Sequence, residues 1–146
     1  MKILAIANQK GGVGKSMLAV HLTWLALEQG QPVLLVDLDG QANSSHTFVD
    51  EFSGLTASML FTIEPGSLTE VPQTISEQFS LISADTAVND VEGLDLGTIE
   101  RPIAHLRNLV QPSSEKDFTC EEVSHAKLLD PEILVIIDTP QPSGGD

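Results

Sequence analysis

Residues 1–16, MKILAIANQKGGVGKS, join a short apolar run to a glycine-rich loop, and this junction decides the fold. The run from Ile3 to Ala7 is apolar throughout, which predicts a parallel strand buried on both faces. Gly11, Gly12 and Gly14 open backbone angles that other residues avoid, so successive N–H groups can turn inward around an anion. The stretch therefore predicts a strand followed by a phosphate-binding loop.

Two residues complete the chemistry of this loop. Lys15 would supply a point charge for the β- and γ-phosphates of a nucleotide, and Ser16 a hydroxyl ligand for Mg²⁺. The helix that starts here would direct the free N–H groups of its first turn at the same anion. We therefore expect a nucleoside triphosphate with Mg²⁺ at the start of this helix.

The segment from Ser16 to Gln29 has the spacing of an amphipathic helix. Leu18, Leu22 and Leu25 form its predicted buried stripe. Trp24 lies beside this stripe and is expected in the core, where large aromatic side chains usually lie. A stripe of this width predicts a helix packed against a sheet.

Two further apolar runs end in carboxylates. Val33 to Val36 leads to Asp37 and Asp39, and Ile133 to Ile137 leads to Asp138. Strand, helix and strand in this order form the βαβ unit of a parallel sheet, whose strands end at the edge where open sheets bind ligands. The chain is therefore predicted to have an α/β fold, with a mostly parallel sheet flanked by helices.

Weaker patterns predict the remaining elements. A polar loop is expected at 40–45, a strand at 79–83, and helices at 55–61, 68–76, 98–111 and 119–129. The acidic stretch 84–97 is typical of a solvated loop or a broken helix, and no spacing in it favours a metal site.

Length and composition favour a single domain, since 146 residues suffice for one core. Cys120 is the only cysteine, which excludes an intrachain disulfide and a cysteine-ligated metal cluster. The leading apolar run is too short for a signal peptide, and no later run approaches the ~20 apolar residues of a membrane helix. We expect a soluble, cytoplasmic protein with no membrane partner.

The net charge of −14 argues against non-specific binding to nucleic acid, which needs several basic residues at phosphates, because the chain has only seven lysines and arginines. The negative net charge does not argue against the binding of ATP. The Debye length is about 8 Å at physiological salt, so a loop with its own donors decides the local field.

The loop departs from the strict P-loop pattern, because Gln9 stands in place of the first glycine. Lys10 to Ser16 instead read KGGVGKS, which resembles the deviant Walker A motif of the ParA/MinD family of P-loop ATPases. DLDGQAN, from Asp37 to Asn43, and IIDTP, from Ile136 to Pro140, are similar to later motifs of that family in the expected order. The resemblance is strongest to ParA/Soj-like partitioning ATPases.

The resemblance implies a site for ATP and Mg²⁺ and a role for each residue. The implied nucleotide-binding residues are Lys10, Gly11, Gly12, Val13, Gly14, Lys15, Ser16 and Met17. The implied catalytic residues are Lys10, Lys15 and Asp39, and those around Mg²⁺ are Ser16, Asp37 and Asp138. Lys10 would reach the phosphates of a partner subunit, and Asp39 would orient or activate the attacking water. Asp37 would support the switch loop or the water shell of Mg²⁺.

The expected function is that of a ParA-type ATPase, a weak, partner-stimulated enzyme that positions a plasmid, a chromosome or other cargo. It would dimerise on Mg-ATP and hydrolyse it slowly, activated by a ParB-like or other protein. Family members continue beyond the length of this chain, so a single, incomplete P-loop domain is expected, with DNA binding only through the absent C-terminal part. The alternative is a nucleotide-binding interaction module without competent hydrolysis. Gly40, in place of the usual proline, and the absent C-terminal half favour this alternative, and Gln141 interrupts the usual pair of prolines after Asp138 and Thr139, so the second switch is expected to differ.

Overall fold

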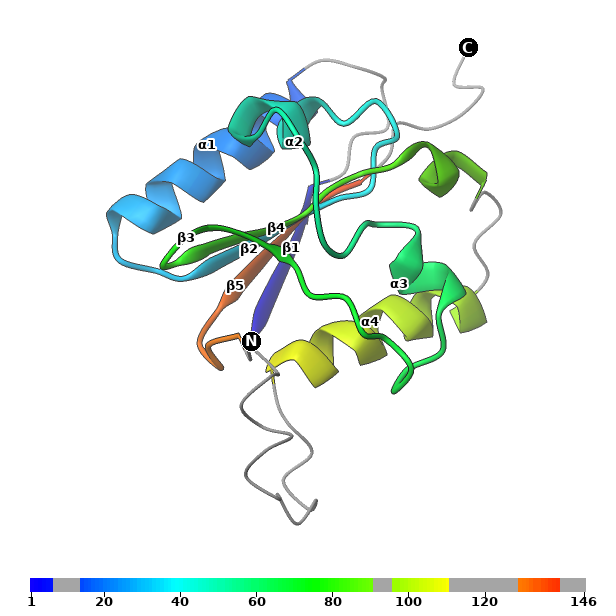
Figure 1. Ribbon diagram of the computed structural model, residues 1–146. Coiled ribbons are helices and arrows are strands. Elements are labelled where there is room, and N and C mark those ends of the chain that lie inside the picture. Colours follow the sequence, from blue (N-terminus) through cyan, green and yellow to red (C-terminus); the bar gives the residue numbers. More distant parts are fainter. Residues whose placement is uncertain (7–13, 91–95, 111–128, 140–146) are drawn as a thin grey trace.

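A central sheet organises the computed structural model, which describes residues 1–6, 14–90, 96–110 and 129–139 (Figure 1). Within these residues the sheet has five strands in the order β1-β5-β2-β4-β3. Their bounds are β1 Lys2–Ile6, β2 Val33–Asp37, β3 Gln73–Ser76, β4 Phe79–Ile82 and β5 Leu134–Asp138. Every neighbouring pair is parallel except β3 with β4. The predicted α/β fold with a mostly parallel sheet is confirmed.

Helices lie on both sides of the sheet. Figure 1 shows α1, Lys15–Glu28, and α2, Asn43–Phe48, on one side, and α3, Met59–Thr62, and α4, Leu96–Val110, on the other. A short 3-10 helix, η1, covers Thr86–Asp90. In the described part of the chain, no helix is long and apolar enough to cross a bilayer.

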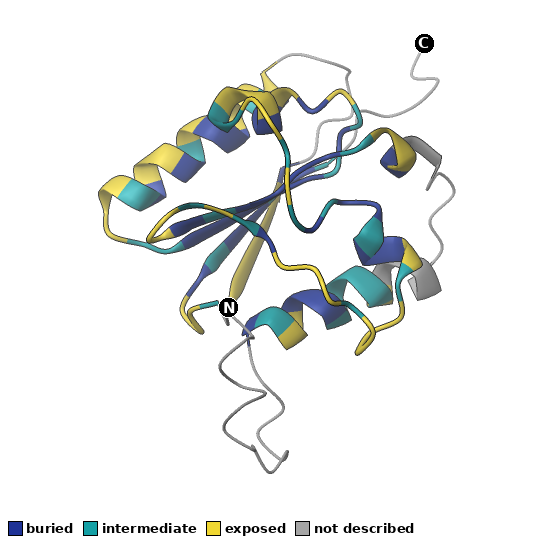
Figure 2. Cartoon of the chain, viewed as in Figure 1, coloured by how far each residue is buried: buried dark blue, intermediate teal, exposed yellow. Residues whose placement is uncertain are grey.

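Strand β2 joins the two halves of the core, because all five of its residues are buried. Leu34 and Val36 belong to the cluster that includes α3 and α4, whereas Val33 and Leu35 belong to the cluster that includes α1. This alternation follows from the two-residue period of a strand. Figure 2 shows the result, in which the inner strands of the sheet are dark and buried while β1 and the outer sides of the helices are exposed.

The prediction that the first strand is buried on both faces is wrong. β1 lies at the edge of the described sheet, where it pairs with β5. Ile3 is 43% exposed and Leu4 is 40% exposed. Apolar composition correctly predicted a parallel strand, but it does not reveal whether a second neighbour covers the strand.

The predicted helix at 16–29 is confirmed as α1, but its predicted buried stripe is correct only at Leu22, which is half-buried and packs against the core. Leu18 and Leu25 are 49% and 50% exposed. Ala19, Thr23 and Ala26 are buried instead. They recur at the spacing of one helix face, and their small side chains let the helix approach the sheet closely.

Trp24 is not in the core as predicted, because about half of its surface is exposed. Its ring meets Phe48 of α2 edge-on, with centroids 5.9 Å apart, and stacks on His21 of its own helix at 5.7 Å. Trp24 therefore covers the joint between α1 and α2.

The predicted helix at 68–76 is wrong, because Gln73–Ser76 forms β3. β3 pairs antiparallel with β4, which confirms the strand expected at 79–83, through a connection of only two residues, Glu77 and Gln78. The connection has none of the glycine or asparagine signals of a tight hairpin. The hairpin therefore could not be predicted from the residues of its turn.

The other predictions differ in outcome. The helix at 98–111 is confirmed as α4, with Leu106 and Val110 buried, and the stretch 84–97 contains η1. The helix at 55–61 is partly correct, because α3 begins only at Met59, and the loop at 40–45 overlaps the start of α2 at Asn43. The helix at 119–129 falls almost entirely outside the described residues.

Gly54→Ala tests a close approach between loops. Gly54 has a φ of +72°, and a Cβ there would lie 2.4 Å from the carbonyl oxygen of Val71. Leu55 N–H donates to that oxygen at 2.8 Å, which prevents it from moving away freely. We expect the free energy of unfolding in urea to fall by about 2–5 kcal/mol, from left-handed strain and overpacking together.

The matched control is Gly66→Ala. Gly66 has a φ of +93°, and its Cβ would meet no described atom within 4 Å. This variant should lose only the strain contribution, about 1–2 kcal/mol. Equal losses in the two variants would contradict the predicted clash at Val71.

Candidate functional site

The site lies at the carboxyl edge of the sheet, where α1 begins. Gly14 precedes the helix with a φ of 80° and a ψ of 0°, a left-handed conformation that glycine adopts without strain. No side chain caps this end of the helix in the described part of the chain. The N–H groups of the first turn are therefore suited to an anion.

Lys15 is the centre of the site. Although it carries a charge, it is buried, and its ammonium contacts the carboxylate of Asp138 and the carbonyl oxygen of Thr139. Asp39 lies further away, with Oδ2 4.0 Å from Nζ. Lys15 thus neutralises carboxylates that come from two different strand ends.

Ser16 holds the other oxygen of Asp138. Its hydroxyl donates to Oδ2 at 2.8 Å. Asp138 ends β5 and is fully buried, and the sheet register aligns it with Ile6 of β1 and Asp37 of β2. The start of α1 is therefore tied directly to the end of β5.

Asp37 lies beside Asp138 but bonds in another direction. Its carboxylate accepts hydrogen bonds from the N–H of Asp39 and from the N–H and hydroxyl of Ser45. Burial raises the pKa of Asp37 above its usual value; the Ser45 hydrogen bonds oppose this shift, and the nearby Asp138 adds to it. The sequence left two roles open for Asp37, support of the switch loop or of the water shell of Mg²⁺. These hydrogen bonds are consistent with support of the loop.

A tight turn follows Asp39. The N–H of Ala42 donates to the carbonyl oxygen of Asp39 at 2.8 Å, and the N–H of Gln41 donates to its Oδ1 at 3.1 Å. The left-handed residue of the turn is Ala42, with a φ of 59°, and Gly40 is not among the residues with positive φ. The carboxylate of Asp39 is thus held by its own loop.

The structure brings together several of the predicted site residues. Gly14, Lys15, Ser16, Asp39 and Asp138 share the carboxyl edge, and Asp37 supports the loop beside them. Met17 lies in the first turn of α1 with an exposed side chain. The predicted residues Lys10, Gly11, Gly12 and Val13 lie outside the described residues.

Two residues of the site were not predicted from the sequence. Thr139 donates its hydroxyl to the carbonyl oxygen of Ile6 at 2.6 Å and so joins the ends of β1 and β5. Ser45 binds Asp37. Thr139 stood within a recognised motif, but a serine eight residues after an aspartate has no pattern that reveals such a contact.

The available donors fit Mg²⁺ better than a transition metal. Ser16 Oγ and Asp138 Oδ2 lie 2.8 Å apart, and both are oxygen atoms of the kind that Mg²⁺ prefers as ligands. No group of three or more histidine, cysteine, aspartate or glutamate side chains in the described ranges could hold a metal. Few protein ligands suit Mg²⁺, which keeps waters and shares the phosphates of its nucleotide.

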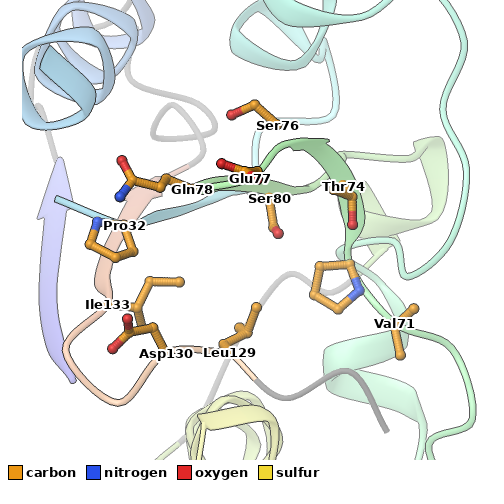
Figure 3. A pocket seen from close by; sticks show the side chains of 11 residues that line it. Pro32, Val71, Thr74, Ser76, Glu77, Gln78, Ser80, Leu129, Asp130 and Ile133 are labelled. Carbon is orange, nitrogen blue, oxygen red and sulfur yellow. The ribbon is translucent and has the colours of Figure 1, made fainter. Parts of the chain in front are cut away.

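A separate pocket of about 450 Å³ lies at the opposite end of the sheet (Figure 3). It is lined by Pro32, Gln78 and Ile133, which precede β2, β4 and β5, together with Val71 and Leu129. It contains none of the predicted site residues. Parallel sheets bind ligands at the carboxyl ends of their strands, so the carboxyl edge is the candidate site.

Comparison with protein families identifies the chain. A family model described as "AAA domain" matches residues 1–120, most of its length. The chain belongs to this family. The matched region contains the described parts of the site except Asp138 and Thr139.

Curated relatives of this AAA-domain chain include protein IncC and a chromosome partitioning protein. It is 41% identical over 101 residues to protein IncC of Escherichia coli, covering 66% of this chain and 28% of IncC. It is 32% identical over 114 residues to the chromosome partitioning protein ParA of Caulobacter vibrioides, covering 76% of this chain and 42% of ParA. The predicted membership in the ParA/MinD-type P-loop ATPases is confirmed. The chain spans less than half the length of these relatives.

Solved structures of similar fold include apo McdA of Cyanothece, with a TM-score of 0.64 and 25% identity. Cobyrinic acid a,c-diamide synthase of Mycobacterium smegmatis, solved with a bound ATP analog and magnesium, has a TM-score of 0.63 and 25% identity. The matches cover 98% and 96% of this chain and 51% of each neighbour. The chain thus has the fold of about half of each neighbour.

Lys15→Met tests whether the ammonium stabilises the AAA-domain fold without nucleotide. Removing the cation leaves the buried carboxylate of Asp138 without its counter-charge. Breaking a buried pair in this way should lower the free energy of unfolding by about 3–5 kcal/mol, measured in urea without Mg²⁺ or nucleotide. Lys2→Met, at an exposed position of β1, is the control and should change it little. Equal stability of the two variants would contradict the role given to Lys15.

Proposed function

We propose that this chain is the nucleotide-binding part of a ParA-type ATPase that binds Mg-ATP, dimerises on it and hydrolyses it slowly. Its residues 1–146 would belong to one P-loop domain. Slow hydrolysis would serve as a timer for positioning a plasmid, a chromosome or other cargo in the cytoplasm. The chromosome partitioning relatives ParA and Soj support this kind of cargo, and the contacts at the start of α1 support the chemistry.

One observation carries the proposal. Lys15, Ser16 and Asp138 converge at the uncapped start of α1, with Ser16 Oγ 2.8 Å from Asp138 and Lys15 in contact with the same carboxylate. A lysine, a hydroxyl and a strand-end aspartate form the minimum set for a nucleotide phosphate and its Mg²⁺. Bound Mg²⁺ would neutralise charge that develops on the phosphates.

The residues of the chain would change partners when ATP binds. Lys15 would exchange the carboxylate of Asp138 and the carbonyl oxygen of Thr139 for phosphate oxygens. Ser16 and Asp138 would hold Mg²⁺ and its waters through the oxygens that now face each other. Asp39 would orient the attacking water, since its carboxylate already lies 4.0 Å from Lys15 Nζ.

Lys10 would act on the other subunit. The resemblance to the ParA/MinD family implies that the side chain of Lys10 reaches the phosphates bound by the partner subunit. A second cation there would stabilise the charge on the transferred phosphoryl group. Dimerisation would then depend on ATP. A ParB-like or other activating protein would stimulate turnover, and any contact with DNA would come from other parts of the protein.

The alternative is a nucleotide-binding interaction module without competent hydrolysis. Gly40 favours it, because glycine in place of proline adds backbone freedom to the loop that carries Asp39. The hydrogen bonds of Asp39 to Gln41 and Ala42 favour the enzyme, because they hold the loop without proline. Phosphate release decides between the two.

Asp39→Asn separates hydrolysis from binding. The amide keeps the size of the side chain but cannot accept a proton, so phosphate release in the presence of Mg²⁺ should fall by about 10²-fold or more. ATP affinity should change little, because the loop and Lys15 supply the binding contacts. The measurement is steady-state phosphate release with saturating ATP, with and without chelator.

Lys15→Ala defines the background of that assay. No Mg²⁺-dependent release above this variant, with activating protein and DNA added, would contradict the ATPase and leave the interaction module. Full activity in Asp39→Asn would contradict only the role of Asp39.

Lys10→Ala should keep nucleotide binding but lose ATP-dependent dimerisation, because its proposed contact lies in the other subunit. Sedimentation with a slowly hydrolysed ATP analogue measures the dimer, and fluorescent-nucleotide titration measures binding. Lys2→Ala removes an exposed lysine of β1 and is the matched control. A dimer of Lys10→Ala as stable as that of the control would contradict the role of Lys10.

A further inference from the structure

Ser45 makes an unusual set of contacts for a helix residue. It lies in α2 and is fully buried, and both its N–H and its hydroxyl donate to Oδ2 of Asp37, at 3.0 and 2.6 Å. Hydrogen bonds to an ionised acceptor are about twice as strong as neutral ones. Ser45 therefore anchors the start of α2 to the end of β2.

The same carboxylate also holds the other end of the connection. Oδ1 of Asp37 accepts the N–H of Asp39 at 3.1 Å. One buried side chain thus binds the backbone both before and after the turn at residues 40–42. These contacts of the Asp37 carboxylate, with Asp39 before the turn and Ser45 after it, form a clamp. The turn carries the carboxylate of Asp39, so the position of that carboxylate depends on the clamp.

A third contact joins the clamp to β4, the neighbour of β2 in the sheet. The hydroxyl of Ser45 accepts the N–H of Ala84 at 3.2 Å, and Ala84 follows the end of β4. A hydroxyl can donate once and accept, so both contacts form together. Ser45 therefore joins the ends of β2 and β4 on the side of the sheet where α2 lies.

We propose that Ser45 is a positioning residue for hydrolysis, which holds the turn that presents Asp39 to the site. This inference rests on the proposed ATPase function. Ser45 acts through Asp37 and would not touch the nucleotide. Its loss would allow the turn to move, and small displacements of a group that orients water cost much of the rate.

Ser44 provides a matched control on the same helix. It is also fully buried, but in the described part of the chain its hydroxyl has no hydrogen-bond partner. Ser44→Ala and Ser45→Ala therefore remove the same atom from equally buried positions. They differ in whether that atom holds Asp37 and Ala84.

The first experiment compares phosphate release by the full-length protein and the two variants, with Mg-ATP. Ser45→Ala should lower kcat about 10-fold or more, as loss of an outer positioning contact does, and leave the KM for ATP within about twofold. Ser44→Ala should match the unmodified protein. Ser45→Cys, whose thiol is a weak donor of similar shape, should fall in between and carries the test if Ser45→Ala does not fold.

The second experiment does not depend on hydrolysis. Hydrogen exchange, followed by NMR without nucleotide, should quicken about 10-fold or more at the amide of Ala42, which closes the turn, in Ser45→Ala and stay unchanged in Ser44→Ala. Unchanged exchange there would overturn the inference, and so would a kcat of Ser45→Ala equal to that of Ser44→Ala. If the unmodified protein releases no phosphate, the proposed function fails and exchange alone decides whether Ser45 holds the turn.

Discussion

The ammonium of Lys15 is the interaction on which the carboxyl edge of the sheet depends. Asp138 is fully buried and Asp39 nearly so, and burying ionised carboxylates costs several kcal/mol each unless a cation lies close by. In the described part of the chain Lys15 is the cation paired with them. The ion pairs of Lys15 therefore offset the cost of burying these strand ends before any nucleotide binds.

Sheet geometry explains why these charges meet. β2 and β5 run parallel and in register, so Asp37 and Asp138 end their strands side by side. The two carboxylates do not compete for the same hydrogen-bond donors, because the side chains that bind them lie on different helices. Asp138 binds Lys15 and Ser16 of α1, whereas Asp37 binds Ser45 of α2. One carboxylate thus binds the start of α1, and its neighbour binds the start of α2.

Sequence patterns predicted strands β1, β2, β4 and β5, helices α1 and α4, and the residues around Lys15, because each rests on local composition or on a motif. The predictions failed where contacts between distant segments decide which residues are buried and which segments pair. Leu18 and Leu25 have a perfect helical spacing, yet the small residues Ala19, Thr23 and Ala26 face the sheet. The hairpin of β3 and the contact of Ser45 with Asp37 depend on pairing between segments, which no local pattern records.

In the described part of the chain, β1 is an edge strand of the sheet, which favours contact between copies of this chain in concentrated solution. An edge strand offers free backbone groups to another copy, and Ile3 and Leu4 add apolar surface beside them. The net charge of −14 keeps copies apart at low ionic strength. At 1 M salt the Debye length falls to about 3 Å, and this repulsion is screened. Salt, which keeps many proteins dispersed, would drive this one toward self-association.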